Sequence, residues 1–222
     1  MPDISNPHDK FFKEVFSRRD TARDFVLNYL PEEIAALIDT DAMEPTKESF
    51  VDGELREHFS DVLFRTILRG GGESYLYLLF EHKSYLEPII AFQLLRYMVR
   101  IWEGWLKEGK KEPFPPIIPI VIYHGKKEWK IGANFRDLFA MSERLRVFIP
   151  DFRHILCDLS DYEDGDIRGA VILKTALLIM KHIFSDDLAN RLPSILRLLE
   201  DLSEKRSGME YLETILRYVV AG

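Results

Sequence analysis

The sequence SDVLFRTILRGGGESYLYLLFEHKSY, residues 60–85, decides the fold, because it predicts two β-strands joined by a glycine turn. Side chains of a strand alternate between its two faces, so Glu81 and Lys83 share one face of the second strand. If the strands fold about Gly71 in antiparallel register, Asp61 stands opposite Glu81. Opposed carboxylates repel one another, since their Cβ atoms lie roughly 5 Å apart. The pair therefore predicts a cation between the two carboxylates.

The Glu-x-Lys triplet carries little weight by itself, because the chain contains it three times, at residues 81–83, 108–110 and 128–130. We interpret the second and third copies as solvated charge pairs. Glu81 differs because it ends a continuous apolar strand, where an uncompensated charge is costly. The alternative interpretation is a surface ion pair between Asp61 and Lys83, and the spacing alone does not decide between the two.

The composition is that of an ordinary soluble globular protein. The chain has 222 residues, of which 46% are hydrophobic and 30% are charged, and this favours one domain with at most a small appendage. Its net charge of -7 argues against broad, sequence-independent binding of DNA over a basic surface. A local basic groove is still compatible with that net charge, because binding depends on how charge is distributed.

The sequence also indicates a reducing compartment. Cys157 is the only cysteine, so no internal disulfide can form, and we expect it to be a buried small apolar side chain. The N-terminal residues lack the basic and apolar regions of a signal peptide, and no apolar run reaches the ~20 residues of a membrane span. We therefore expect a cytoplasmic protein without a membrane partner.

Hydrophobic periodicity predicts an α/β core with a mixed central sheet flanked by helices. A strongly amphipathic helix over residues 89–107 separates the hairpin from apolar strands at 117–124 and within 148–159. Further helical patterns precede the hairpin over residues 8–30.

Three helical patterns, at 166–184, 186–204 and 207–220, follow the last strand. We therefore divide the chain into a core, residues 1–160, and a C-terminal helical extension, residues 161–222. The extension either packs on the core or forms a dimer interface.

The residues at the open end of the hairpin suit the hydrolysis of a phosphodiester. Asp61 and Glu81 would supply the oxygen ligands that Mg²⁺ prefers, although two carboxylates do not distinguish Mg²⁺ from Mn²⁺. The metal would polarise the phosphate and lower the pKa of an attacking water. Lys83 would position that water or offset the charge that develops on the phosphate.

The order of several sequence blocks resembles a known family. Asp61 followed by Glu81-x-Lys83 on the next strand resembles the PD-(D/E)xK nuclease signature. The blocks PHDKFFKEVFSRRDTARDFVLNYLP, FSDVLFR, LLFEHKS, LLRYM and IPIVIYHG occur in that order over roughly residues 7–160 and are similar to the Rpn family of recombination-promoting nucleases, which are also catalogued as transposases. The proline of the superfamily name is replaced here by Ser60, whereas Lys83 is the superfamily's standard residue.

The resemblance implies a restriction-endonuclease-like core and a metal-dependent DNA endonuclease activity linked to recombination or mobile elements. By position in the family pattern, Gln93 and Tyr97 resemble a QxxxY element, although Tyr97 also lies on the apolar stripe of its helix, where a core role is expected. Glu14 on the first helix is a second supporting candidate, with an ordinary exposed helix charge as the alternative. Arg96 and Arg100 are candidates for contact with DNA phosphates, and a solvated helix face is their alternative.

We therefore expect a Mg²⁺-dependent deoxyribonuclease that uses Asp61, Glu81 and Lys83. Cleavage of both strands of a duplex needs two sites, so we also expect a homodimer, with the helical extension as its interface. The alternative function is a catalytically silent module on the same fold that binds DNA or protein.

Overall fold

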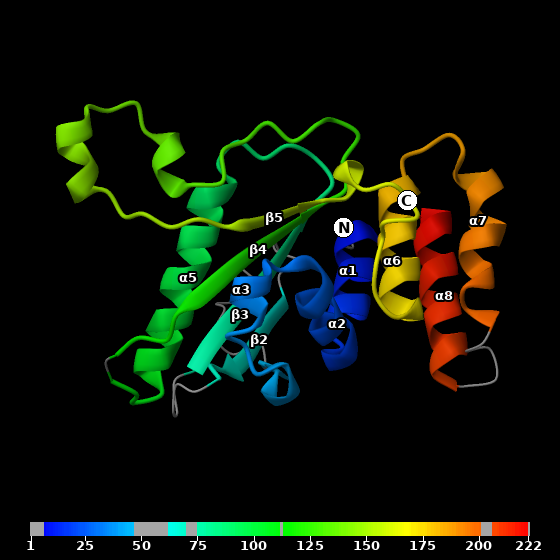
Figure 1. Ribbon diagram of the computed structural model, residues 1–222, viewed down its shortest axis with the longest axis horizontal. Coiled ribbons are helices and arrows are strands. Elements are labelled where there is room, and N and C mark those ends of the chain that lie inside the picture. The colour runs from blue at the N-terminus through cyan, green and yellow to red at the C-terminus, as the bar shows by residue number, and fades with distance from the viewer. Residues whose placement is uncertain (1–6, 47–61, 70–74, 112, 201–205, 222) are drawn as a thin grey trace, which may run out of the picture.

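The computed structural model describes residues 7–46, 62–69, 75–111, 113–200 and 206–221, and for residues 75–82, 206 and 207 it describes the backbone alone (Figure 1). Asp61 and the glycine turn, Gly70–Gly72, lie outside the described residues.

A five-stranded mixed sheet forms the centre of the protein, as the sequence predicts. Its strands follow one another in chain order, the first three antiparallel and the last three parallel. They are β1 (Glu44–Pro45), β2 (Val62–Ile67), β3 (Tyr75–Lys83), β4 (Ile117–Tyr123) and β5 (Ile155–Asp158).

The register of the hairpin is the one predicted for a turn centred on Gly71. Val62 pairs with Phe80 at one end of the β2–β3 ladder, and Ile67 pairs with Tyr75 at the other. A shift of one residue would exchange the two faces of β2, so this register determines what each face buries.

Helix α5 (Ile90–Lys107) covers one face of the sheet, at the left of Figure 1. Its apolar stripe, which includes Leu94, Tyr97 and Ile101, packs around Val121 of β4, and Leu63 of β2 packs against the same cluster. The predicted amphipathic helix is thus confirmed, and its buried stripe explains why a helix forms here.

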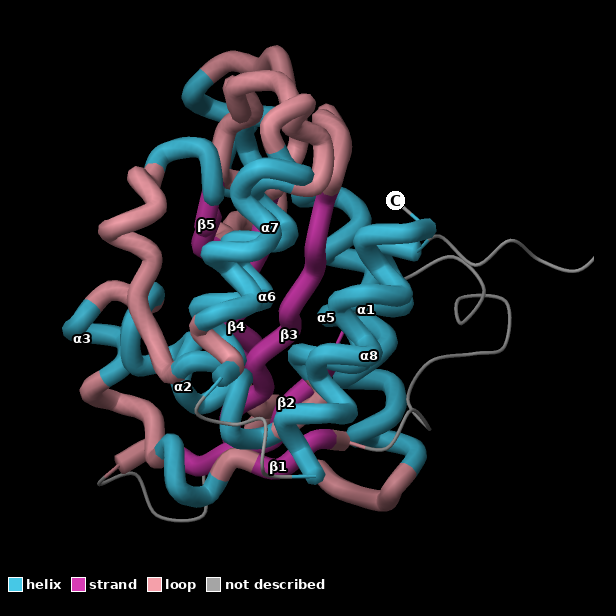
Figure 2. The backbone as a smooth tube through the Cα atoms, turned by 90° about the vertical axis from the view of Figure 1, so that its right-hand side faces the viewer, coloured by secondary structure: helices cyan, strands magenta, loops and turns pink. Residues whose placement is uncertain are grey.

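The opposite face of the sheet is covered by helices from both ends of the chain. Val62, Phe64, Ile120 and Ile122 of the sheet join one hydrophobic cluster with residues of these helices. In Figure 2 helices α6 and α7 lie in front of the strands. The helices are α1 (Pro7–Phe16), α2 (Arg19–Tyr29), α3 (Glu32–Ala35), α6 (Val171–His182), α7 (Leu188–Arg197) and α8 (Arg206–Ala221).

The C-terminal helices pack on the core. Helix α6 contacts α2, α8 contacts α1, and buried residues of the extension such as Leu177 and Ile179 belong to the same cluster as Phe64. The boundary at residue 160 stays a prediction.

An arm, residues 134–153, extends from the sheet between β4 and β5 and stands apart from the other elements at the upper left of Figure 1. It contains two 3₁₀ helices, η3 (Phe135–Leu138) and η4 (Glu143–Phe148), and two more, η1 (Thr40–Ala42) and η5 (Leu159–Asp161), lie elsewhere in the described part of the chain. Its base is closed by stacking of Phe135 on Phe152, with ring centroids 5.4 Å apart. The far end exposes apolar side chains, since Val147 is 79% and Phe148 is 77% exposed.

His154 lies buried where the arm joins β5. Its ring nitrogens have no hydrogen-bond partner among the described residues, and its side chain is buried. Burial, with a smaller effect of the Arg153 charge, lowers the pKa of His154 from 6.5 to about 4. The folded protein therefore holds His154 neutral in a pH range where the unfolded chain binds a proton.

We predict that His154 makes the protein sensitive to mild acid. The unfolded state binds the additional proton, so stability is present above the unfolded pKa of 6.5 and is lost as pH falls towards 4. The loss between pH 7 and pH 4 is about 3 kcal/mol, at 1.36 kcal/mol for each pKa unit.

Urea unfolding of the wild type and of a His154→Leu variant across this pH range checks the prediction. The variant retains the acid sensitivity of the other groups, so the difference between the two proteins isolates His154. Parallel curves for the two proteins would contradict the assignment.

Candidate active site

The end of β3 carries the residues that the sequence predicts as a site. Lys83 is its last residue and is described in full, whereas only the backbone of Glu81 is described and Asp61 lies outside the described residues. In the parallel β3–β4 ladder Glu81 lies beside Val121 and Lys83 lies beside Tyr123. Val121, the β4 partner of Glu81, packs against α5.

Lys83 is a buried lysine, only 7% exposed. Its backbone oxygen accepts a hydrogen bond of 3.0 Å from the His124 amide, and its Nζ lies 5.7 Å from the centre of the Tyr85 ring. A buried ammonium needs anions or dipoles around it, because desolvation of an uncompensated charge is costly. Lys83 is therefore not a surface residue, and its pairing with Asp61 lies outside what the structure describes.

The other two Glu-x-Lys triplets are surface ion pairs, as the sequence predicts. The Lys110 and Glu108 side chains lie 2.6 Å apart, and those of Lys130 and Glu128 lie 3.0 Å apart. In the latter pair both side chains are 74% exposed.

Gln93 and Tyr97 lie on α5, one turn apart. Tyr97 is 2% exposed and belongs to the apolar cluster around Val121, so its predicted core role is confirmed. The side-chain oxygen of Gln93 is buried and accepts no hydrogen bond from the described residues. Such an oxygen is costly to leave unpaired, and it marks a place where a water or a ligand donor would be held.

Glu14 does not join this site. It lies on α1, in the layer on the opposite face of the sheet from α5, and its Oε2 lies 3.2 Å from Nη2 of Arg217 in α8. The family pattern gave only its position on the first helix, and this ion pair gives Glu14 a structural role between α1 and α8.

The two arginines proposed for DNA contact lie on α5 but differ in their surroundings. Arg96 is exposed on the outer side of the helix. Arg100 is partly buried and donates a 2.7 Å hydrogen bond to Glu103, so part of its charge is already neutralised. Arg96 is therefore the better placed of the two to meet a phosphate.

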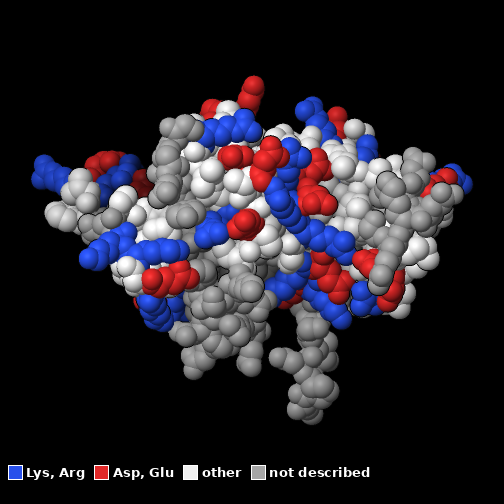
Figure 3. Space-filling model, turned by 90° about the horizontal axis from the view of Figure 1, so that it is seen from below, with Lys and Arg blue, Asp and Glu red and all other residues white. Residues whose placement is uncertain are grey.

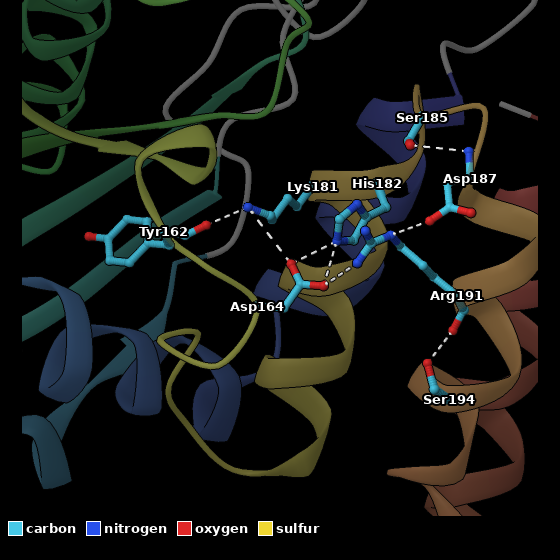
Figure 4. Close-up of polar contacts among 8 residues, drawn as sticks. All are labelled: Tyr162, Asp164, Lys181, His182, Ser185, Asp187, Arg191 and Ser194. Carbon is cyan, nitrogen blue, oxygen red and sulfur yellow. Dashed lines mark hydrogen bonds and ion pairs between the residues drawn. The ribbon is translucent and has the colours of Figure 1, made fainter.

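A polar cluster outside the site joins α6 and α7 to the segment that follows β5 (Figure 4). Asp164 accepts hydrogen bonds from His182 at 2.8 Å and from Arg191 at 2.9 Å, with Lys181 3.8 Å away. Burial opposes the ionisation of Asp164, but the His182 hydrogen bond and the nearby positive charges outweigh it and hold its pKa below the usual range. The cluster holds α6 and α7 against the segment that follows β5.

The described residues offer neither a metal-binding cluster nor an activated cysteine. Among the side chains that the structure describes, no group of three His, Cys, Asp or Glu residues is arranged to hold a metal ion, and this search does not include Asp61 or the Glu81 side chain. Cys157 is buried as predicted, and burial raises its thiol pKa to about 12, so it is not an activated nucleophile.

A pocket of about 410 Å³, which the sequence does not predict, lies at the carboxyl ends of β3 and β4. It is lined by Ser84, Tyr85, Leu86, Tyr123, Lys126, Lys127 and Phe184. Part of this pocket could have been found from the sequence. The segments that contain Tyr85 and Lys126 directly follow predicted strands, so they are expected at the same edge of the sheet. Phe184 comes from the extension, and no local pattern places it there.

Comparison with known proteins identifies the family to which this chain belongs. The chain belongs to the family described as "Putative transposase, YhgA-like", whose sequence model matches residues 6–210. It is 32% identical over 203 residues to the recombination-promoting nuclease RpnD of Escherichia coli O157:H7, which covers 88% of this chain and 75% of the relative. The resemblance to recombination-promoting nucleases is therefore confirmed.

Two relatives from Escherichia coli K12 differ in what their names say. The chain is 34% identical over 186 residues to the recombination-promoting nuclease RpnA, covering 83% of this chain and 62% of the relative. It is 32% identical over 198 residues to RpnE, which is named an inactive recombination-promoting nuclease-like protein. This match covers 88% of this chain and 64% of the relative. The chain thus spans less than two thirds of the length of these two relatives.

No solved structure matches the chain, so the restriction-endonuclease-like core stays a proposal. None of the helices in the described part of the chain combines the length and the hydrophobicity that crossing a bilayer requires.

We predict that, with EDTA present so that no ion-bound water donates to it, Gln93→Leu raises the free energy of unfolding by about 1 kcal/mol, because it removes a buried oxygen that has no donor among the described residues. Asn28→Leu is the matched control, since the Asn28 side chain donates hydrogen bonds to the backbone oxygen and the carboxylate of Asp24. Loss of those bonds should cost about 1 kcal/mol. Chemical denaturation measures both values, and equal destabilisation by the two changes would show that Gln93 is hydrogen-bonded in solution.

Proposed function

We propose that this protein is a Mg²⁺-dependent DNA endonuclease with a PD-(D/E)xK site on a restriction-endonuclease-like core. The observation that carries the proposal is the β2–β3 register, whose last described pair is Val62 with Phe80. Continued by one residue, this register would set Asp61 against Glu81. The names of the relatives RpnD and RpnA support a nuclease activity.

The chemistry of Asp61 and Glu81 supports a divalent cation as the cofactor of this site. Two opposed carboxylates are stable together only if a cation offsets their repulsion, and carboxylate oxygens are the ligands that Mg²⁺ and Mn²⁺ prefer. The buried Gln93 oxygen, on the helix that covers this face, is an acceptor for a water beside the ion. When bound, the metal would supply a polarised phosphate and a water of lowered pKa.

Lys83 has the position and the burial for the third role. By strand alternation it shares a face with Glu81, and its ammonium lies in surroundings of low dielectric. There it would hold the attacking water by a hydrogen bond and offset negative charge that develops on the scissile phosphate. Carboxylates close by would in turn stabilise the buried ammonium.

DNA contact in this proposal depends on a few placed cations rather than on a basic surface. The face seen in Figure 3 shows acidic and basic side chains interspersed, in agreement with the net charge of -7. We assign phosphate contact to Arg96 on the outer side of α5, with Arg100 as a weaker contributor because it also binds Glu103. We retain a cytoplasmic homodimer as the proposed assembly, since two sites are needed to cut both strands.

The second candidate function is a catalytically silent module that binds DNA or protein. The name of the relative RpnE, which describes an inactive nuclease-like protein, favours it. The two candidates differ in turnover, so one cleavage experiment separates them.

A plasmid-nicking assay with Mg²⁺, Mn²⁺ or EDTA tests the proposal. We predict that Asp61→Asn, Glu81→Gln and Lys83→Met each lower the cleavage rate about 100-fold or more, because each removes a group that acts on the reacting phosphate. Glu128→Gln and Lys130→Met, in an exposed triplet of the same pattern, are matched controls and should leave the rate unchanged.

Two outcomes would overturn the proposal. Cleavage that persists in EDTA and in the Asp61→Asn variant would exclude the metal mechanism. Absence of cleavage with every metal, from a folded protein that binds the plasmid, would favour the silent module.

A further inference from the structure

The pocket at the carboxyl ends of β3 and β4 adjoins the candidate active site. Tyr85 and Ser84 directly follow Lys83, and Tyr123 is the β4 residue that lies beside Lys83. Its volume of about 410 Å³ is within the range of about 300–1,000 Å³ that small-molecule sites occupy. A ligand held here would lie next to the lysine that we assign to catalysis.

Three aromatic residues, Tyr85, Tyr123 and Phe184, line the pocket. Of these, Tyr123 is fully buried. Phe184, just after α6, stacks nearly parallel to His124, with 5.9 Å between ring centroids and 5° between planes, and the His8 ring packs 5.0 Å away. These contacts fix the orientation of Phe184. Tyr85 is 56% exposed, so its ring is accessible from solvent.

Cations lie over the rings of Phe184 and Tyr85. The Nζ of Lys126 lies 5.7 Å from the centroid of Phe184, and that of Lys83 lies 5.7 Å from the centroid of Tyr85. The Lys127 backbone oxygen accepts a 2.5 Å hydrogen bond from the buried Tyr123 hydroxyl, which anchors the segment that carries both loop lysines. The pocket therefore combines flat apolar surfaces with positive charge.

We propose that this pocket binds one unpaired nucleotide of a DNA strand. The base stacks on the rings of Tyr85 and Phe184, and Lys126 and Lys127 contact the phosphate beside it. Aromatic rings suit any base, because every base has a π face, and lysines suit the backbone. This inference rests on the proposed function and adds a substrate preference for single-stranded or frayed DNA.

The extension acquires a role in this proposal. Phe184 is the residue of the pocket that comes from beyond β5, and the Asp164 cluster binds the helices on both sides of it through His182 and Arg191. The C-terminal helices therefore contribute part of the DNA site.

Fluorescence anisotropy with the full chain tests the proposal, with EDTA present so that no strand is cut. The probes are a labelled single-stranded oligonucleotide, the same strand with abasic sites, and its blunt duplex. We expect the wild type to bind the normal strand at least tenfold more tightly than the abasic strand or the duplex, since base stacking contributes about 1–3 kcal/mol.

Two substitutions remove the aromatic faces and keep apolar bulk. Tyr85→Leu and Phe184→Leu should each weaken binding of the normal strand about tenfold and leave the abasic strand unaffected. Tyr85 is exposed, so its variant tests the pocket even if Phe184→Leu fails to fold. Phe148→Leu, in a residue that is 77% exposed at the far end of the arm, is the matched control and should bind like the wild type.

Equal binding of normal and abasic strands, or wild-type binding by both aromatic variants, would overturn the proposal. Inorganic phosphate that competes fully with the normal strand would show an anion site without base recognition, and would also overturn it. Because binding is measured without turnover, the pocket is tested apart from the nuclease. Base-dependent binding by a protein that never cuts DNA would leave the pocket intact and remove the proposed function.

Discussion

The antiparallel pairing of β2 with β3 is the constraint on which the rest of the structure depends. Its register decides that Val62 and Phe64 face the large helical cluster, while Leu63 faces α5. A slip of one residue would exchange the residues of the two faces and place Arg65 in the large helical cluster, so packing on both faces enforces this register. The same pairing brings the start of β2 next to the end of β3, where Lys83 is buried.

Much of this arrangement could be predicted from the sequence, because the deciding signals are local. Glycines between two apolar runs fix a hairpin, and a helical stripe such as Leu94, Tyr97 and Ile101 predicts a helix that covers a sheet. Other features depend on contacts between distant segments. The presence of Phe184 and Tyr85 in one pocket and the pairing of Glu14 with Arg217 bring together residues that share no pattern in the chain.

Burial distinguishes Lys83 from the other lysines that follow a Glu-x pattern. Lys110 and Lys130 pair with their own glutamates at the surface, whereas Lys83 is enclosed at the end of the apolar strand β3. A protein retains a buried charge at a cost in stability, and function is a common reason for such a cost. Family membership is compatible with activity or its loss, since relatives are named as nucleases and as an inactive nuclease-like protein. Whether this chain is active therefore depends on whether Asp61 and Glu81 bind a metal ion.

Calorimetric titration of the protein with Mn²⁺ is the most direct test that Asp61 and Glu81 share one cation. The account predicts one ion per chain, with strong losses of affinity in Asp61→Asn and in Glu81→Gln. The double variant should be no weaker than either single variant, because two ligands of one ion are coupled and their losses do not add. Unchanged Mn²⁺ affinity in either single variant, or losses that add as they do for independent sites, would contradict a shared site.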